Sequence, residues 1–194
     1  MLHPKRRAFS FGRRAAEKTG ANGPLSTHCR CFGKRGFDLI GLDADCSFRA
    51  GDCRKCRCRL RLAACMGVAV DLIEPMGFEW DDRRVRRTAM DYIDHVAIAR
   101  HGSFEAFRST TGQRRLVLFT TKSRQSAYDF DFNADDILLF GKESAGVPGS
   151  VWDSCAARVR IPMRAAVRSL NLAMTAALGL GEALRQTSML PLDR

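Results

Sequence analysis

Apolar and polar positions follow a regular pattern only from Leu60 onward. Short, nearly continuous apolar runs there predict buried strands, and they alternate with stretches whose apolar residues recur at helical spacing. Such strands, buried on both faces and separated by helices, are typical of an α/β fold with a mostly parallel sheet and helices on both faces. The pattern predicts strands at 68–73, 95–99, 115–121, 136–140 and 158–161, and helices at 61–65, 85–92, 104–108 and 170–185.

In residues 1–59 the apolar positions recur at neither the helical nor the strand spacing. They hold 14 Lys and Arg against 5 Asp and Glu, whereas residues 60–194 hold 18 basic against 16 acidic residues. Six of the eight cysteines also lie in residues 1–59. We therefore divide the chain into an irregular, basic, cysteine-rich segment at 1–59 and one folded domain at 60–194. We expect the first segment to be disordered, or to be a frameshifted or upstream translation.

The cysteine-rich segment does not predict a metal site. It holds one C-x-x-C pair, Cys53 to Cys56, and a zinc site usually takes two such pairs. No apolar run approaches the roughly 20 residues that a membrane span needs. We therefore expect no metal, no membrane association and a cytoplasmic location.

Three loops follow predicted strands, at 120–122, 141–146 and 162–169. Ligands of parallel sheets bind beyond the carboxyl ends of the strands, so these loops are the candidate site. Gly141 and Gly146 flank Glu143, and glycine tolerates positive φ and a close approach of a ligand to the backbone. We expect Gly141 to leave space for that ligand. Ser169 is also a natural N-cap for the helix that follows it.

The predicted helix at 170–185 is apolar nearly all round, which means that it is buried on several sides. Its small residues would allow another helix to approach closely. In a domain of this size, such a helix suggests a subunit interface. We therefore expect a homodimer built on this helix, and expect Glu at Ala176 or Ala177 to disrupt it.

Motifs in the three loops resemble the signature of the SPOUT methyltransferases. They are Gly141-x-Glu143-x-x-Gly146-Val147-Pro148, Ile161-Pro162-Met163 and Arg168-Ser169-Leu170-Asn171-Leu172-Ala173. Within that family the chain is most similar to the small tRNA (cytidine/uridine wobble) 2'-O-methyltransferases of the TrmL type. Matches to the same subfamily are Glu74-Pro75-Met76-Gly77-Phe78, Trp80-Asp81-Asp82, Arg86-Arg87 and Asp91-Tyr92. The resemblance covers about residues 60–188 and implies a deep C-terminal trefoil knot, S-adenosyl-L-methionine as cofactor, and a homodimer.

The resemblance also implies roles for individual residues. Arg61 matches the arginine of the family's first motif, which is thought to meet the ribose and phosphate. Glu143, Ser169 and Asn171 match polar positions that hold the active site together, and with Arg61 they are the catalytic candidates. The cofactor is expected on the backbone of Phe119, Gly141 and Ile161 with Ser169 beside it, and Thr120, Met163 and Leu170 are expected to line the same pocket.

The expected chemistry requires a ribose 2'-hydroxyl to lose its proton as it attacks a sulfonium methyl group. No His lies in the three loops, and the Arg61 guanidinium stays protonated in proteins. We therefore expect Arg61 to clamp a phosphate and polarise the hydroxyl, while the proton passes to a phosphate or to water. We expect a cluster of four arginines to contact the RNA. The alternative interpretation is that these arginines simply form a solvent-exposed helix face. The cluster comprises Arg83, Arg84, Arg86 and Arg87.

The family's opening motif, L-F-x-P-x-I-x-x-N-x-G, is absent, and residues 43–59 stand in its place. Codons for these residues, read one base later, permit M-R-I-A-L-F-G-P-E-I-A-G-N-A-G-A in register with Leu60. We hypothesise that residues 43–59 are a frameshifted reading and that residues 1–42 are upstream sequence. The chain as written would then lack its first strand, and its sheet would have an open edge.

The leading interpretation is an S-adenosylmethionine-dependent enzyme that methylates the ribose 2'-hydroxyl of the tRNA wobble nucleotide, a cytidine or a carboxymethylaminomethyluridine. One alternative is a SPOUT 2'-O-methyltransferase with another tRNA or rRNA target. The other is a non-catalytic RNA-binding protein that uses its basic N-terminal segment. The compact body, which has no separate RNA-binding domain, favours the wobble-site interpretation.

Overall fold

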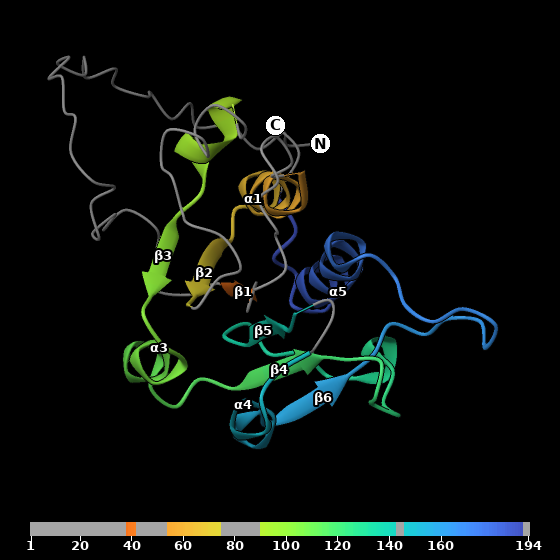
Figure 1. The fold of residues 1–194 in the computed structure, drawn as a ribbon. Helices are drawn as coiled ribbons and strands as arrows, with labels where there is room; N and C mark the ends of the chain where they lie inside the picture. The colour runs from red at the N-terminus through yellow and green to blue at the C-terminus, as the bar shows by residue number, and fades with distance from the viewer. Residues whose placement is uncertain (1–37, 42–53, 75–89, 143–145, 192–194) are drawn as a thin grey trace, which may run out of the picture.

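The computed structural model describes residues 38–41, 54–74, 90–142 and 146–191. Six strands form one sheet in the order β3-β2-β1-β5-β4-β6, and every neighbouring pair is parallel (Figure 1). The strands are β1 (Asp38–Gly41), β2 (Ala69–Ile73), β3 (Ile98–His101), β4 (Leu116–Phe119), β5 (Ile137–Phe140) and β6 (Ala157–Val159). The helices are α1 (Arg54–Met66), η1 (Met90–His95), α3 (Phe104–Thr111), η2 (Ala127–Asp129), α4 (Gly149–Ser154) and α5 (Leu172–Gln186).

The described helices cover both faces of this sheet, as the apolar runs predict. Side chains alternate between two apolar clusters along each central strand, because successive residues of a strand point to opposite faces. In β4, Val117 and Phe119 join the cluster that contains residues of α1 and α5, whereas Leu116 and Leu118 join the cluster that contains residues of α3 and α4. The α/β fold with a parallel sheet and helices on both faces is thus confirmed.

The position of β1 corrects the expectation that the chain as written lacks its first strand. β1 lies between β2 and β5, and Leu39 pairs with Val70 on one side and Leu138 on the other. The missing strand was expected to leave an open edge, but this position is at the centre of the sheet. A strand with neighbours on both sides pairs its backbone with both, and the backbone of Asp38–Gly41 does so with β2 and β5.

Helix α1 corrects the expected boundary at residue 59. The predicted helix at 61–65 is only the carboxyl-terminal part of a helix that begins at Arg54 and ends at Met66. Residues 54–59 are therefore helical, and residues 38–41 form a strand, so the expectation of irregular structure throughout 1–59 is wrong at these two places. Residues 54–59 are mostly Arg, Lys and Cys, so they show no apolar period from which a helix could be predicted.

Smaller differences concern element ends. The strand expected at 95–99 lies at Ile98–His101, and a 3-10 helix occupies Met90–His95. Most of the helix expected at 85–92 lies outside the described residues. No helix in the described parts of the chain is long and apolar enough to span a membrane.

Candidate active site

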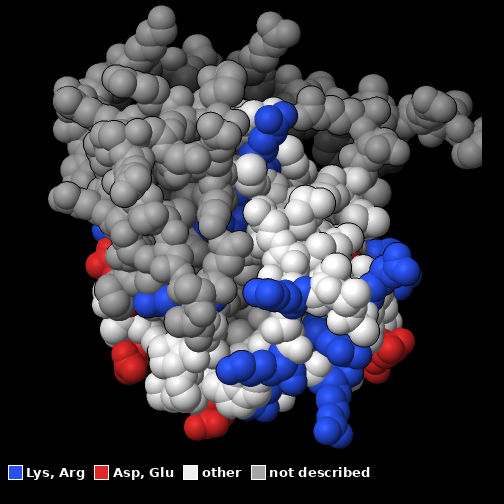
Figure 2. All heavy atoms as spheres, turned by 45° about the vertical axis from the view of Figure 1, so that its right-hand side comes forward, with Lys and Arg blue, Asp and Glu red and all other residues white. Residues whose placement is uncertain are grey.

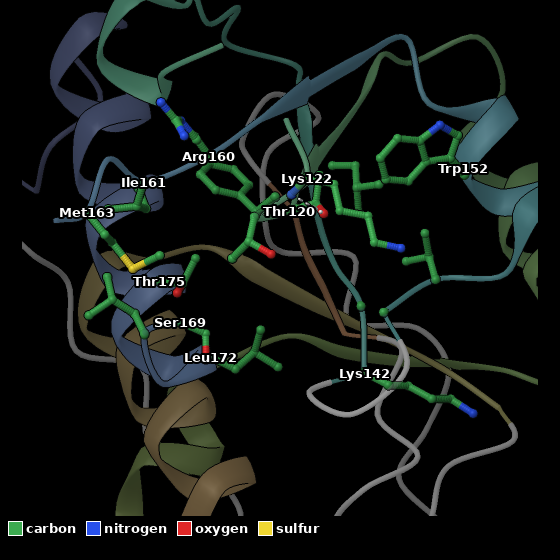
Figure 3. A pocket seen from close by; sticks show the side chains of 17 residues that line it. Thr120, Lys122, Lys142, Trp152, Arg160, Ile161, Met163, Ser169, Leu172 and Thr175 are labelled. Carbon is green, nitrogen blue, oxygen red and sulfur yellow. Dashed lines mark hydrogen bonds between the residues drawn. The ribbon is translucent and has the colours of Figure 1, made fainter. Parts of the chain in front are cut away.

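A pocket of about 300 Å³ lies where β4, β5 and β6 end, at the three loops that the sequence indicates (Figure 3). This volume is at the lower end of the range for small-molecule sites, roughly 300–1,000 Å³. Apolar side chains, four hydroxyl-bearing residues and three cations form most of its wall. The residues that the argument uses are Phe119, Thr120, Lys122, Gly141, Lys142, Val147, Trp152, Arg160, Ile161, Met163, Ser169, Leu170 and Thr175.

The first loop, which follows β4, is held against β6 by hydrogen bonds. The Thr120 backbone N–H donates to the Val159 carbonyl at 2.8 Å, and the Ser123 hydroxyl donates to the Arg158 carbonyl at 2.7 Å. Further along, the Arg160 N–H donates to the Gln125 carbonyl at 2.9 Å. These bonds continue the β4–β6 pairing beyond both strands, so the first loop and the start of the third are fixed side by side.

The second loop, after β5, closes on itself. The backbone groups of Lys142 and Gly146 exchange two hydrogen bonds of 2.8 Å, and Gly146 has a φ of +70°. A Cβ at Gly141 would lie 2.6 Å from the Gly146 carbonyl carbon and 2.8 Å from Val147 Cγ1. The closure of this loop therefore requires a glycine at position 141. That Gly141 also leaves space for a ligand stays a prediction. The positive φ belongs to Gly146.

The third loop leads into α5. The Asn171 Oδ1 accepts a hydrogen bond of 2.8 Å from the Ala173 N–H, so Asn171 is the N-cap of α5. The N-cap reading of Ser169 is therefore wrong. Ser169 lines the pocket instead, while Asn171 is not among the lining residues.

The floor of the pocket is a packed aromatic cluster beneath α5. The Phe119 ring stacks on Phe140 with ring centroids 4.9 Å apart and lies 6.3 Å from Phe132. A Cβ at Gly179 of α5 would lie 2.5 Å from the Phe119 ring. Helix α5 can therefore cover Phe119 only because residue 179 has no side chain.

The structure brings together all seven residues expected around the cofactor. Each of them lines this one pocket: Phe119, Thr120, Gly141, Ile161, Met163, Ser169 and Leu170. They come from the ends of β4 and β5, from the residues after β6, and from the segment that leads into α5. Figure 3 labels four of them, Thr120, Ile161, Met163 and Ser169.

The structure does not bring the expected catalytic residues together in the same way. Arg61 does not line the pocket; it is exposed on α1, and its guanidinium carbon lies 4.6 Å from the centroid of the Tyr92 ring. Glu143 lies outside the described residues. So do the four arginines of the expected RNA contact, Arg83, Arg84, Arg86 and Arg87.

Sequence reasoning missed several residues of the pocket wall, among them Lys122, Lys142, Trp152 and Arg160. Trp152 comes from α4, and the Arg158 guanidinium carbon lies 4.9 Å from its ring centroid. A basic residue in a loop carries no local signal that distinguishes a pocket wall from open surface. For Lys122 the signal was its position directly after the strand predicted at 115–121. Arg160 falls inside the strand predicted at 158–161, whereas β6 ends at Val159.

The electrostatic character of the pocket is positive. Its described lining contains Lys122, Lys142 and Arg160 but no carboxylate and no imidazole. The nearby Cys155 is buried, and this burial raises the pKa of its thiol to about 11, so it is not a nucleophile at neutral pH. No group of three or more His, Cys, Asp or Glu that could hold a metal ion occurs in the described residues. The hydroxyls and cations of the pocket can therefore bind, orient and polarise a ligand.

Comparisons with known proteins found a matching family, similar proteins and similar solved structures. The SpoU rRNA Methylase family matches residues 59–181. A tRNA (cytidine(34)-2'-O)-methyltransferase of Beijerinckia indica subsp. indica is 56% identical over 140 residues, covering 71% of this chain and 87% of that protein. A solved structure described as showing 2-OH methylation of C/U34 on tRNA has a TM-score of 0.69 at 32% identity, covering 79% of this chain and 97% of that one.

One further solved structure bears on the ligand. The SpoU methyltransferase AviRb of Streptomyces viridochromogenes, in complex with AdoMet, has a TM-score of 0.62 at 25% identity. The match covers 77% of this chain and 59% of that one. The similarity therefore extends to a protein of the same family that binds S-adenosylmethionine.

Proposed function

Because this chain belongs to the SpoU rRNA Methylase family, we propose that it is an S-adenosylmethionine-dependent enzyme that methylates the ribose 2'-hydroxyl of tRNA nucleotide 34. The substrate nucleotide is a cytidine or a carboxymethylaminomethyluridine, and the enzyme works in the cytoplasm. One observation carries the proposal: all seven residues that the family resemblance assigns to the cofactor line one pocket, at the carboxyl ends of three parallel strands.

The described pocket fits S-adenosylmethionine, which supplies an activated methyl group when bound. Ile161, Met163 and Leu170 offer apolar surface for the adenine, and Thr120 and Ser169 offer hydroxyls that can bond the ribose and the polar tail. Gly141 lines the same pocket and, as a glycine, presents only its backbone to a ligand there. These residues would hold and orient the cofactor. Methyl transfer is faster when the methyl group and the attacking hydroxyl are kept in line.

The proton of the 2'-hydroxyl has no acceptor among the described pocket residues. Lys122, Lys142 and Arg160 favour an alkoxide electrostatically as it forms, because positive charge placed beside the reacting oxygen stabilises the developing negative charge. The proton then passes to a phosphate of the RNA or to water. Arg61 lies outside the pocket of its own protomer, so its proposed role in clamping a phosphate requires a substrate that extends beyond this pocket or a second copy of the chain.

We also propose the two finer features of the family, a homodimer and a deep C-terminal trefoil knot. Support for the dimer comes from α5, where Met174 and Leu178 are 58% and 40% exposed although both are large and apolar. They are four residues apart and therefore share one face of the helix. Support for the knot is the family membership and the 97% coverage of the C/U34 methylation structure.

The decisive experiment maps the methyl group. Purified protein is incubated with labelled S-adenosylmethionine and tRNA from a strain that lacks the gene, and the product nucleosides are identified by mass spectrometry. The expected result is 2'-O-methylation at nucleotide 34. Methylation at another tRNA or rRNA position would support the alternative target, and RNA binding without methyl transfer would support a non-catalytic RNA-binding protein.

A further inference from the structure

The two chain segments beside the pocket mouth carry an unusual concentration of positive charge. Residues 120–127 and 158–171 together contain six Lys and Arg and no Asp or Glu. Arg158 turns inward, with its guanidinium over the Trp152 ring and a hydrogen bond to the Trp152 carbonyl. The other five are exposed: Lys122, Arg124, Arg160, Arg164 and Arg168. We call these five residues the basic rim.

The basic rim is a built surface, because hydrogen bonds join its two segments. Thr120, Ser123 and Gln125 bond to the backbone of residues 158–160, and the Ala127 N–H donates to the Arg160 carbonyl at 2.8 Å. Lys122 and Arg160 are thereby held on the pocket wall although they are 38 positions apart in the sequence. Figure 2 shows Lys and Arg side chains (blue) near the centre of the visible face and Asp and Glu side chains (red) at its margin.

The charge of the basic rim decides what it can bind. No carboxylate in the described parts of the chain forms an ion pair with Lys122 or Arg160. S-adenosylmethionine carries a sulfonium, an ammonium and one carboxylate, so it is a net cation at neutral pH, and five exposed cations exceed what one carboxylate needs. A polyanion with regularly spaced charges satisfies all of them, and the phosphate backbone of RNA is such a ligand.

We propose that the basic rim binds the phosphates of the substrate RNA, and that Lys122 and Arg160 contact the phosphates on either side of the ribose that enters the pocket. This inference rests on the proposed function only in taking the polyanion to be RNA. Figure 3 shows the Lys122 and Arg160 side chains extending away from each other from the pocket wall. Two charges that diverge from one wall suit two successive phosphates better than one.

The test is the salt dependence of RNA binding by the full chain carrying Lys122→Gln and Arg160→Gln. The probe is a transcribed tRNA with cytidine at position 34. Each lost contact with single-stranded phosphate lowers the slope of log K against log salt by about 0.7, which is about fivefold in affinity at 0.1 M salt. The double variant should therefore lose about 25-fold in affinity and about 1.4 in slope. Because both residues line the cofactor pocket, the affinity of the double variant for S-adenosylhomocysteine is measured as well, and it should fall by much less than the affinity for RNA.

Three controls make the result decisive. Arg100→Gln removes the same charge on β3, at the opposite edge of the sheet from β6, and should leave the slope unchanged. Lys122→Arg with Arg160→Lys keeps both charges and should keep RNA affinity within a fewfold of wild type. If the double variant fails to fold by circular dichroism, each single variant should show about a fivefold loss.

The proposal is overturned if the double variant loses S-adenosylhomocysteine binding while the salt slope for RNA is unchanged, because the cations would then serve the cofactor carboxylate. It is also overturned if Arg100→Gln weakens RNA binding equally, because net charge alone would explain the effect. Failure of the proposed function looks different. The wild-type protein would then bind RNA with the full salt slope but place no methyl group on nucleotide 34.

Discussion

At the scale of single residues, two glycines determine how closely the backbone packs around the pocket. Gly141 has the Gly146 carbonyl carbon 2.6 Å from where a Cβ would stand, and Gly179 has the Phe119 ring at 2.5 Å. Real Cβ atoms do not approach other atoms so closely, and forcing one in costs typically 1–3 kcal/mol through backbone shifts. Both positions are therefore sites where a single methyl group should alter the pocket.

Gly141→Ala should lower thermal stability and weaken binding of S-adenosylhomocysteine by tenfold or more. The added Cβ would push the second loop away from β5, and this loop forms part of the pocket wall. Calorimetry and thermal unfolding measure the two effects. The matched control is Gly149→Ala at the start of α4, where an added Cβ meets nothing within 4 Å. Equal behaviour of the two variants would contradict this account of Gly141.

At the scale of elements, the carboxyl end of α5 is joined to the segment after η2 by a chain of hydrogen bonds. The Phe132 N–H donates to Gln186 Oε1 at 3.0 Å, and Gln186 Nε2 donates to Glu182 Oε1 at 2.8 Å. Arg185 donates to both oxygens of Glu182. Hydrogen bonds from Arg185 and then Gln186 lower the pKa of the Glu182 carboxyl from its ordinary 4.5 to about 2.

Glu182→Gln should lower the unfolding midpoint at pH 7 by about 1–3 °C, the range for an ion pair whose arginine is exposed to solvent. Since the folded state lowers the pKa of Glu182, the ionised carboxylate stabilises the fold above pH 4.5. This contribution falls as the pH drops below 4.5 and is gone below about 2. Midpoints of both proteins measured from pH 7 to 2 should therefore converge in acid. A constant difference across this range would show that ionisation of Glu182 is not the cause.

Strand β1 gives a second prediction at this scale. Ile40 pairs with Asp71 on one side and Leu139 on the other, and proline is excluded from central strands because it removes a ladder hydrogen bond. Ile40→Pro should destabilise the chain by about 1–3 kcal/mol, the cost of leaving a buried polar group unsatisfied. Denaturant unfolding measures it. An unchanged midpoint would mean that another segment fills the centre of the sheet.

The reading-frame hypothesis remains a proposal, and β1 sharpens its test. In a chain translated from the shifted frame, the segment I-A-L-F would compete for the central position that Asp38–Gly41 occupies here. A more apolar strand buries more surface at the centre of a sheet, so the shifted-frame protein should be the more stable of the two. Sequencing the gene and comparing unfolding midpoints decides it. A gene that cannot encode the N-x-G loop in the shifted frame would refute the hypothesis.

At the scale of the whole molecule, α5 exposes two large apolar side chains, Met174 and Leu178, on one face. Ala176 is 1% exposed and belongs to the core of the protomer, so the expectation that Glu at this position would test the dimer is wrong. A charge there would unfold the protomer itself. The exposed residues Met174 and Leu178 are the proper probes of the interface.

Met174→Glu combined with Leu178→Glu should convert the proposed dimer to a monomer while the protomer stays folded, because both side chains already face outward. Light scattering measures the mass, and circular dichroism checks the fold. Met174→Gln with Leu178→Gln is the matched control for polarity without charge and should weaken the dimer less. A wild-type protein that is monomeric at micromolar concentration would refute the proposed interface.

The amino-acid sequence by itself determined strands β4 and β5 and the place of the site. Leu116–Phe119 and Ile137–Phe140 are apolar at every position, and such short runs are stable only as strands buried on both faces. Once these strands are parallel, the loops that follow them must meet at one edge. That is why the seven residues expected around the cofactor were found in one pocket.

Only the tertiary structure decided which distant residues belong together. Asp38–Gly41 carries no period that marks a central strand, and its role comes entirely from the ladders of β2 and β5. Arg61 lies near Tyr92 and away from the pocket, whereas Lys122 and Arg160 share the pocket wall because β4 pairs with β6. The physical reason is that local patterns report which residues are buried, but strand order and packing determine what each residue faces.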